Sequence, residues 1–290
     1  MRSAAVARYG ALVGTPVSAY VVRRPPPSLR AAVVHYCGYR LSGFDPGVHV
    51  GLPSPHLTLI LTLDDPVAVR WPGGSGRLHA MVGGLHDHPV EIEHDGSQFG
   101  IELALTPLGC RGLFGAPAAA VARSVVPLDA LFGSRAGELL ERAAAAGTWA
   151  ARFAAVDRVL TAAVDTAPPV VRPEVRAAWR HLLVTRGRAA VSAVADDLGW
   201  SRRHLGEQFR REVGLAPKTV ARMVRFHHAQ RLLRAEDGPS IGTVAAVTGY
   251  ADQSHMTREW QAFVGAAPAT WLASEQFPSV QDDGDPAPAS

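Results

Sequence analysis

Two histidines and a glutamate in the first half of the chain have the residue types and the spacing of a metal site. His86, His88 and Glu93 occur in "HDHPVEIEH", and Gly100 follows at H-x-H-x4-E-x6-G spacing. Imidazoles and a carboxylate on adjacent strands of a β-barrel could bind a transition metal. A complete set needs a further His after a Pro-x-Gly, and Gly112 stands where that His is required. We therefore expect no metal or other cofactor, and "GGLHDHP" is predicted to be a solvent-facing turn.

The two cysteines, Cys37 and Cys110, could react with oxidants or alkylating agents. They form no C-x-x-C motif, which argues against a zinc site built on thiolates and is typical of a reducing compartment. Isolated cysteines are mostly small buried hydrophobic residues, and we expect that here. The sequence contains no set of a nucleophile and a base, so we predict that the protein is not an enzyme.

The length and composition indicate two domains. The chain has 290 residues, of which 47% are hydrophobic. It contains no apolar run of about 18 residues, and residues 1–15 lack the apolar stretch and cleavage site of a signal peptide. We therefore expect a cytoplasmic protein that does not bind a membrane.

Positive charge is concentrated in the C-terminal part of the chain. Residues 170–275 contain 15 Lys and Arg against 10 Asp and Glu, whereas residues 1–169 contain 14 against 13. Nearly all of the basic residues in the C-terminal part are Arg, whose planar guanidinium can bind phosphates and guanine edges. A solvated helix face would have the same composition, so the charge alone does not establish a nucleic-acid partner.

The first part of the chain is predicted to be rich in β-structure. Short runs of strand-like composition alternate with Gly, Pro and Asp breaks such as "DDP" and "PGGSG". These runs cover residues 56–63, 67–71, 78–82, 90–94 and 99–105. Two helices are expected next, over 128–146 and 148–164, with Gly147 ending the first and Thr148 capping the second. Even, short strands of this kind are typical of a small antiparallel barrel or sandwich.

The segment "DTAPPVVRP" cannot continue a helix and marks the domain boundary. We expect an α+β protein, with a β-rich, small-barrel or cupin-like domain and two helices followed by an all-α domain. The expected divisions are a flexible start (1–15), an N-terminal domain (16–165, β-rich over 16–115 and helical over 128–165), a linker (166–173), a helical domain (174–275) and a disordered tail (276–290). The helices of the second domain are predicted over 174–185, 192–198, 201–213, 217–235, 240–248, 252–263 and from Pro268 onward.

Two stretches of the helical domain repeat one pattern about fifty residues apart. "GWSRRHLGEQFRREVGLAP" starts at Gly199, and "GYADQSHMTREWQAFVGAAP" starts at Gly249. In each, Ala precedes the Gly by four residues, two large apolar residues lie four apart, and Gly-x-x-Pro closes the unit. The Ala lets two helices cross closely, the Gly permits a tight turn, and Ser201 or Asp252 can cap the second helix. Each stretch therefore predicts a helix-turn-helix, whose second helix can enter the DNA major groove.

With these two units, residues 176–272 resemble the DNA-binding domain of the AraC/XylS family of bacterial transcription regulators. The resemblance also includes the joining helix "ARMVRFHHAQRLL" and the closing "GAAPATW". It implies two helix-turn-helix units bridged by one long helix. Two recognition helices held about one DNA turn apart, roughly 34 Å, could read successive major grooves without a protein dimer.

The resemblance also implies which residues face DNA. By position, the residues expected to contact bases are Arg202, Arg203, Glu207, Gln253, Ser254, His255 and Arg258. Those expected to contact phosphates are Ser201, Arg210, Lys218 and Thr257. Gly206 also lies on this face, but it departs from the expected base-reading pattern because it has no side chain to contact a base. A solvated surface residue is the alternative interpretation of each of these positions.

The N-terminal half resembles the sensor part of actinobacterial-type AraC regulators, through "GLPSPHLTLILTL" and "LTPLGCRGLFGAP". This resemblance implies a regulatory role without naming an effector. The expected partners are double-stranded DNA, an unidentified small-molecule effector, RNA polymerase, and a second copy of the chain bound through the N-terminal half. The alternative function is a metal-dependent cupin-like enzyme with a helical appendage, which would need the incomplete set at His86, His88 and Glu93.

Overall fold

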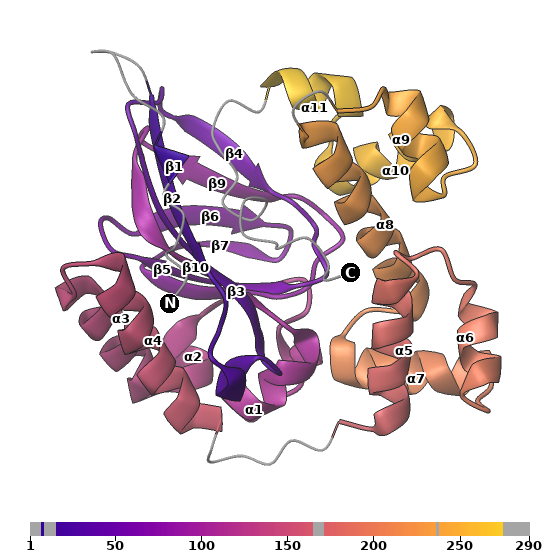
Figure 1. Cartoon of the computed structure of the whole chain (residues 1–290), viewed down its shortest axis with the longest axis horizontal. Coiled ribbons are helices and arrows are strands. Elements are labelled where there is room, and N and C mark those ends of the chain that lie inside the picture. Colours follow the sequence, from indigo (N-terminus) through magenta and orange to yellow (C-terminus); the bar gives the residue numbers. More distant parts are fainter. Residues whose placement is uncertain (1–6, 9–15, 165–170, 236–237, 275–290) are drawn as a thin grey trace.

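The computed structural model describes residues 7–8, 16–164, 171–235 and 238–274. It contains a β-rich domain followed by a helical domain (Figure 1). Most of the predicted flexible start, most of the predicted linker and all of the predicted disordered tail lie outside the described residues. None of the helices within these ranges is long and apolar enough to cross a membrane.

Two antiparallel sheets form the β-rich domain. The larger has the strand order β1-β2-β3-β10-β5-β8-β11, and the smaller has the order β4-β9-β6-β7. The strands of the larger sheet are β1 (Ala7–Arg8), β2 (Val17–Arg23), β3 (Val33–Ser42), β5 (Leu57–Thr62), β8 (Ala80–Gly83), β10 (Gln98–Leu105) and β11 (Val125–Pro127). The smaller sheet contains β4 (Gly47–Gly51), β6 (Val67–Trp71), β7 (Gly74–Leu78) and β9 (Val90–His94). The α+β class with a β-rich first domain is therefore confirmed.

The larger sheet has a different partner on each face because its side chains alternate. Leu57, Leu59 and Leu61 of β5 point into a core that they share with Phe153 and Leu160 of the helices. The intervening residues of β5 face the smaller sheet, where a second apolar cluster fills the space between the two sheets. The domain is thus a β-sandwich. The larger sheet packs against the smaller sheet on one face and against helices on the other.

Three helices cover the outer face of the larger sheet: α2 (Leu128–Phe132), α3 (Ser134–Ala145) and α4 (Trp149–Val164) (Figure 1). The prediction of one helix over 128–146 is wrong, because Gly133 has φ +57° and separates α2 from α3. The predicted cap of α4 is confirmed, since the amide of Ala151 donates to Oγ1 of Thr148 at 3.2 Å. The predicted break "PGGSG" is wrong in its second half, because β7 begins at Gly74 and pairs with β6.

Seven helices form the second domain, within the part of the chain that the model describes. They are α5 (Pro173–Val184), α6 (Val191–Asp197), α7 (Arg202–Val213), α8 (Pro217–Arg234), α9 (Ile241–Thr248), α10 (Gln253–Val264) and α11 (Pro268–Ser274). Helix α8 contacts both the α5–α7 group and the α9–α11 group (Figure 1). Trp179 stacks on Phe209 in the first group, and Phe226 of α8 packs edge-on against Trp260 in the second. Helix α8 therefore contributes side chains to the apolar cores of both groups.

Within its described residues, the β-rich domain also contains three short 3-10 turns. They are η1 (Pro27–Leu29), η2 (Pro107–Gly109) and η3 (Ala118–Val121), next to the short helix α1 (Cys110–Phe114). The turns η2 and η3 both contact α7. Cys37 and Cys110 are both buried, as predicted. Burial raises the pKa of the Cys110 thiol to about 12, with the nearby Glu212 carboxylate adding to the shift, so this sulfur is a protonated thiol at neutral pH.

Candidate nucleic-acid interface

The first repeated stretch forms a helix-turn-helix from α6 and α7. Ala195 is fully buried where the two helices cross, and Gly199 adopts φ +66° in the turn. Oγ of Ser201 accepts a hydrogen bond from the amide of His204 at 3.1 Å, which caps α7. Gly214 ends the helix in the left-handed region, at φ +89°. Each feature matches the prediction from the sequence.

The second stretch repeats this geometry in α9 and α10. Ala245 is buried, and Gly249 has φ +86°. The carboxylate of Asp252 accepts from the amide of His255 at 2.6 Å and caps α10. Gly265 ends α10 at φ +82°. In both units the amide that donates to the capping side chain belongs to a histidine three residues after the cap. The two units therefore share this hydrogen bond as well as their sequence pattern.

An aromatic residue braces that histidine in each unit. Trp200 lies edge-on to His204, with ring centroids 4.6 Å apart, and Tyr250 lies edge-on to His255 at 5.3 Å. Both aromatics directly follow the Gly of the turn. These two aromatic residues were not predicted from the sequence, although the Gly-aromatic step that both units share could have indicated them.

The predicted reading face of α7 is exposed. Arg202, Arg203, Glu207 and Arg210 are all solvent-accessible, and the side chain of Arg203 is 89% exposed. Nε of Arg203 lies 2.9 Å from Oε1 of Glu207, one helical turn away, so the free protein holds these two side chains together. The pair lowers the pKa of the Glu207 carboxyl through the hydrogen bond from Arg203. Gly206 is buried between them and offers no contact.

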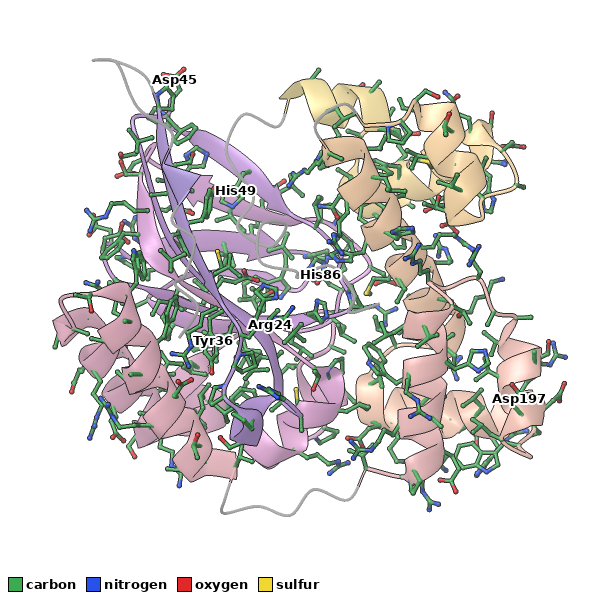
Figure 2. All side chains as sticks on the ribbon, viewed as in Figure 1. Arg24, Tyr36, Asp45, His49, His86 and Asp197 are labelled. Carbon is green, nitrogen blue, oxygen red and sulfur yellow. The ribbon has the colours of Figure 1, made fainter. Side chains whose placement is uncertain are left out.

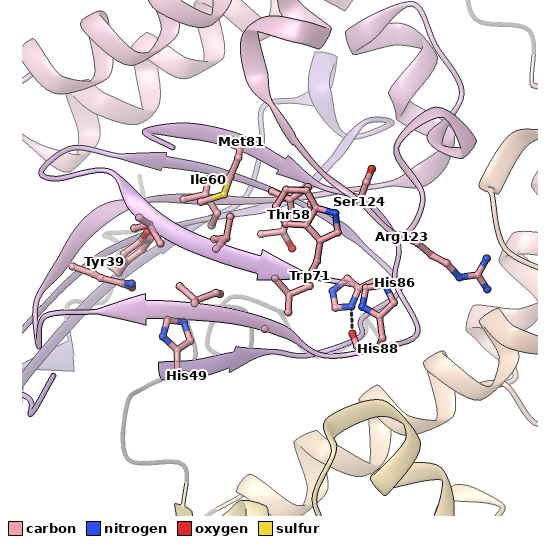
Figure 3. Close-up of a pocket in the computed structure, with 18 residues that line it drawn as sticks. Tyr39, His49, Thr58, Ile60, Trp71, Met81, His86, His88, Arg123 and Ser124 are labelled. Carbon is pink, nitrogen blue, oxygen red and sulfur yellow. Dashed lines mark hydrogen bonds between the residues drawn. The ribbon is translucent and has the colours of Figure 1, made fainter. Parts of the chain in front are cut away.

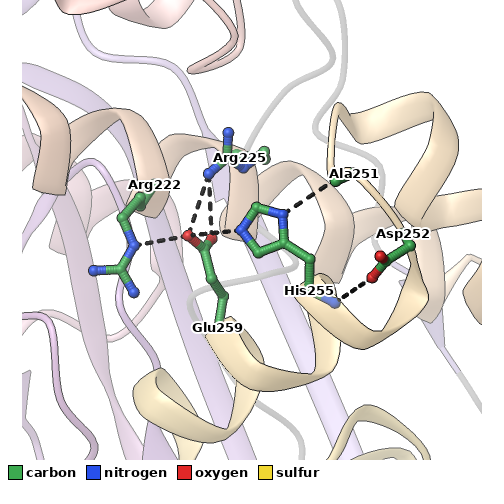
Figure 4. A network of polar contacts seen from close by, with 6 residues as sticks. All are labelled: Arg222, Arg225, Ala251, Asp252, His255 and Glu259. Carbon is green, nitrogen blue, oxygen red and sulfur yellow. Dashed lines mark hydrogen bonds and ion pairs between the residues drawn. The ribbon is translucent and has the colours of Figure 1, made fainter.

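The predicted reading face of α10 is exposed at three of its four positions. Gln253, Ser254 and Arg258 are accessible, whereas His255 is half-buried in a polar network (Figure 4). Nδ1 of His255 accepts from the amide of Ala251 at 3.3 Å, and its Nε2 faces a glutamate. The His255 ring is therefore fixed by the fold on both of its nitrogens.

That glutamate, Glu259, joins α10 to α8. Its side chain is 9% exposed, and Oε1 accepts from Nε of Arg222 at 2.7 Å and from Nη2 of Arg225 at 3.3 Å (Figure 4). Oε1 also lies 3.7 Å from Nε2 of His255. Two guanidinium groups therefore compensate the buried carboxylate, and the cluster sets the angle between α10 and α8. Glu259 was not among the residues predicted from the sequence, although an acidic residue between the core positions Met256 and Trp260 was a signal.

The predicted phosphate contacts flank these faces. Ser201, Arg210 and Lys218 are exposed, and Thr257 is half-buried. Lys218 is the second residue of α8, where the helix N-terminus adds positive potential. The predicted base and phosphate contacts thus lie on the two helix-turn-helix units, except Lys218, which lies on the helix α8 that joins them.

The N-terminal domain contacts the C-terminal end of α7. Nε of Arg111 lies 2.8 Å and 2.9 Å from the two carboxylate oxygens of Glu212, which is buried. A Cβ placed on Gly214 would lie 2.4 Å from the Cβ of Ala122 and 2.9 Å from the Cα of Ala119. Because these contacts are at the C-terminal end of α7, they leave Arg202 and Arg203 at its N-terminal end free of the N-terminal domain.

The histidine loop of the β-rich domain is not a solvent-facing turn, and that prediction is wrong. His86 and His88 are half-buried and line a cavity between the two sheets (Figure 3). Figure 2 shows His49 and His86 within this domain. The loop turns inward because Nδ1 of His86 and Nδ1 of His88 approach the backbone carbonyls of His88 and Pro89.

The predicted metal candidates are not brought together. The rings of His86 and His88 are 5.4 Å apart, but Oε1 of Glu93 lies 2.7 Å from Nη2 of Arg70 and is half-exposed. Across the described residues, no three His, Cys, Asp or Glu side chains are grouped as metal ligands. That the protein binds no metal stays a prediction, which elemental analysis of the purified protein would check.

Comparison with known proteins agrees with this geometry. Residues 194–274 match a family model described as a helix-turn-helix domain. The match begins in α6 and ends in α11, so it covers both units and the joining helix α8.

Individual relatives match either a short stretch of the sequence or the fold of most of the chain. The uncharacterized HTH-type transcriptional regulator YbfI of Bacillus subtilis is 38% identical over 58 residues, which is 20% of each chain. The chain therefore matches only a fifth of the length of that curated relative. ToxT from Vibrio cholerae is 11% identical, with a TM-score of 0.50 over 82% of this chain and 97% of the other. A structure of ToxT bound to (E)-4-(8-methylnaphthalen-1-yl)but-3-enoic acid gives 11% identity and a TM-score of 0.50, covering 81% and 97%. The two-domain fold is thus shared with ToxT.

Proposed function

We propose that this protein is a transcription regulator that binds double-stranded DNA through both helix-turn-helix units. The observation that carries the proposal is the pair of recognition helices, α7 and α10, capped in the same way and mounted on one helix. The 18 residues of α8 span about 27 Å at 1.5 Å per residue. That length is close to the roughly 34 Å that separates successive major-groove segments on one face of DNA.

In this proposal the exposed side chains of α7 and α10 read bases. Arg203 can donate to O6 and N7 of guanine, Glu207 can accept from cytosine N4, and Gln253 can pair with an adenine edge. Arg203 must first release Glu207, so each of the two side chains exchanges a protein partner for a base. Arg210 and Lys218 set the register of the protein through phosphates.

The half-buried His255 has a different part in the proposal. Its ring is already held between the amide of Ala251 and the carboxylate of Glu259. The part of the ring left exposed can contact a base only in the orientation that the network imposes. In the proposal, His255 therefore contributes to base recognition by presenting one edge of its imidazole ring in a fixed orientation.

The proposal assigns the N-terminal domain a sensing role and assigns the protein no enzymatic activity. A signal bound there can reach DNA because Arg111 and Ala122 contact the end of α7. RNA polymerase and a second copy of the chain, bound through the N-terminal half, are further proposed partners. A regulator of this kind works on the chromosome, which places the proposed site of action in the bacterial cytoplasm.

Selection of bound fragments from genomic DNA by the purified full-length protein tests the proposal. We expect the wild type to enrich a few fragments that share one motif, and the Arg203→Ala/Arg258→Ala variant to lose that enrichment. Arg142→Ala/Arg158→Ala is the matched control, because it removes the same charge from exposed positions on α3 and α4 of the N-terminal domain. Equal recovery of all fragments by the wild type would contradict sequence-specific binding.

A further inference from the structure

A loop of the helical domain lies between the starts of the two recognition helices. It joins α5 to α6, and we call its residues 185–188, with the sequence Thr-Arg-Gly-Arg, the bridging loop. Helix α6 leads from this loop to the turn before α7, so α7 starts at the other end of α6. The loop also reaches the second unit, because a Cβ on Gly249 would lie 3.0 Å from Cγ of Arg188. Figure 1 shows the loop between the helices of the first unit and those of the second.

The backbone of the bridging loop is fixed against α8. Arg186 has φ +51°, which a residue other than glycine adopts at a cost. Gly187 has φ +69°, and a Cβ at this position would lie 1.9 Å from the carbonyl oxygen of Ala221 in α8. The amide of Gly187 donates to the carbonyl of Leu182 at 2.8 Å. The loop is therefore seated directly on the joining helix, and its two Arg side chains start from a fixed backbone.

The two Arg side chains of the bridging loop have no acidic partner. Both Arg186 and Arg188 are exposed. Nη1 of Arg186 donates to Nε2 of His228 at 3.2 Å, and Nε of Arg188 donates to the carbonyl of Thr185 at 3.4 Å. Within the described residues, neither guanidinium is paired with a carboxylate. Two positive charges are therefore close together at the surface between the two units.

The histidine that contacts Arg186 lies in a positively charged environment. Burial lowers the pKa of His228 to about 4, and the nearby guanidinium groups of Arg186 and Arg231 add to the shift. The ring is therefore neutral at pH 7, and its Nε2 is able to accept from Arg186. A neutral partner orients this guanidinium but does not compensate its charge, which stays available to an anion.

A DNA duplex bound to both units places its minor groove opposite this loop. When two recognition helices occupy successive major-groove segments on one face of B-DNA, the minor groove between those segments faces the protein. The minor groove is about 6 Å wide, so it admits a side chain but not a helix. Runs of A·T pairs narrow this groove and strengthen its negative potential, which attracts Arg. The bridging loop has two Arg side chains at the position that faces the groove.

We propose that Arg186 and Arg188 enter the minor groove between the two major-groove sites and select DNA whose intervening base pairs are A·T-rich. The selection acts through the width and potential of the groove, because neither side chain needs to pair with a particular base. The bridging loop is then a third reading element beside α7 and α10, and α8 holds all three. This inference rests on the proposed function, because it requires that both recognition helices bind one duplex.

The first arm of the test changes only the base pairs between the two contacted segments. Three duplexes carry the same segments from one selected fragment, and their intervening pairs are all A·T, all G·C or all I·C. Inosine lacks the N2 amino group of guanine, so an I·C pair resembles G·C in the major groove and A·T in the minor groove. Fluorescence anisotropy with the full-length protein measures each Kd. We expect the A·T and I·C duplexes to bind about tenfold more tightly than the G·C duplex.

The second arm removes the two charges of the bridging loop. Arg186→Gln/Arg188→Gln keeps much of each side chain, and we expect its Kd values for the three duplexes to agree within about twofold. Arg176→Gln/Arg180→Gln is the matched control, because it removes the same charge from exposed positions on α5. This control should keep the preference for A·T and I·C, whatever its overall affinity. Circular dichroism checks that both variants are folded.

The outcomes separate this inference from the proposed function. If the wild type enriches no fragment, the proposed function fails and the inference fails with it. If the wild type binds a selected duplex with the same Kd for all three intervening sequences, minor-groove selection alone is overturned. An I·C duplex that binds as weakly as the G·C duplex would also overturn it, because the preference would then come from the major groove. A preference that persists in Arg186→Gln/Arg188→Gln would overturn the role of the bridging loop.

Discussion

Nε2 of His255 lies 3.7 Å from Oε1 of Glu259, one turn further along α10, and that same oxygen accepts from Nε of Arg222 at 2.7 Å. A residue expected to read DNA is thus held by a carboxylate that also fixes the recognition helix to α8. If His255 contacts DNA as proposed, one buried carboxylate both positions α10 and orients a side chain that reads DNA.

Glu259→Gln tests this dual role. The substitution leaves Arg222 and Arg225 without their compensating charge, and loss of one partner from a buried ion pair costs about 3–5 kcal/mol. We expect the free energy of unfolding to fall by about that amount, measured with urea. Glu207→Gln is the control, because it also removes a charge paired with Arg but at an exposed position, and stability should not change. Equal stability of wild type and Glu259→Gln would show that the cluster does not hold α10.

Arg203→Ala is expected to relax sequence choice at one base pair. An Arg that forks onto guanine contributes about 5- to 150-fold discrimination against the wrong base, and its loss should reduce preference at that position only. Lys218→Ala should weaken binding to all duplexes alike, because a phosphate contact carries no sequence information. Competition binding with each single-base variant of the selected site measures both. Equal losses on specific and random duplexes for Arg203→Ala would assign this side chain to phosphate.

Binding should be strongly salt-dependent. Each neutralised phosphate contributes a slope of about −0.9 in log K against log salt, so Arg210 and Lys218 alone predict about −1.8. With the other Arg side chains of the domain, we expect a total slope steeper than about −2 between 50 and 200 mM salt, the range over which this effect is usually resolved. A flat response would exclude phosphates as a main source of affinity.

The stability of the β-rich domain should fall in mild acid. Burial lowers the pKa of His86 from 6.5 to about 4. Between these two pH values, the His86 side chain is protonated in the unfolded chain but neutral in the folded chain. The contribution of neutral His86 to the free energy of unfolding is therefore complete above pH 6.5, and it is lost as the pH falls from 6.5 toward 4. We expect a loss on the order of 2 kcal/mol by pH 4.5, and a smaller loss in His86→Asn. Urea unfolding at pH 4.5, 5.5 and 7.5 measures it, and identical pH profiles for the two proteins would contradict the burial of His86.

Local chemistry predicted the two helix-turn-helix units well. Ser201 and Asp252 could be assigned as caps because a cap depends only on its own helix, and Gly199 and Gly249 because a tight turn needs a positive φ. The buried position of Glu259 depends on Arg222 and Arg225 of another helix, 37 and 34 residues away, which no local pattern reveals.

The sequence predicted the β-rich half less completely. The central strand β3 pairs with β10 across more than fifty residues, and its composition, with His35 and Cys37, gives no regular alternation. The inward turn of the loop at His86 depends on side-chain contacts with its own backbone carbonyls, so its polar composition indicated solvent instead. The contact between Ala122 and Gly214 joins two domains and has no signature in either segment.

In the proposed function, one chain reads two successive major grooves with α7 and α10. A missing-contact footprint of the full-length protein on a selected duplex, repeated with five base pairs inserted between the two contacted segments, tests it most directly. We expect two contacted segments about one helical turn apart, roughly 10 base pairs, bound by a single chain. One segment should be lost after the insertion, because α8 fixes their spacing. A single contacted segment per chain, or two segments that require two chains, would contradict it.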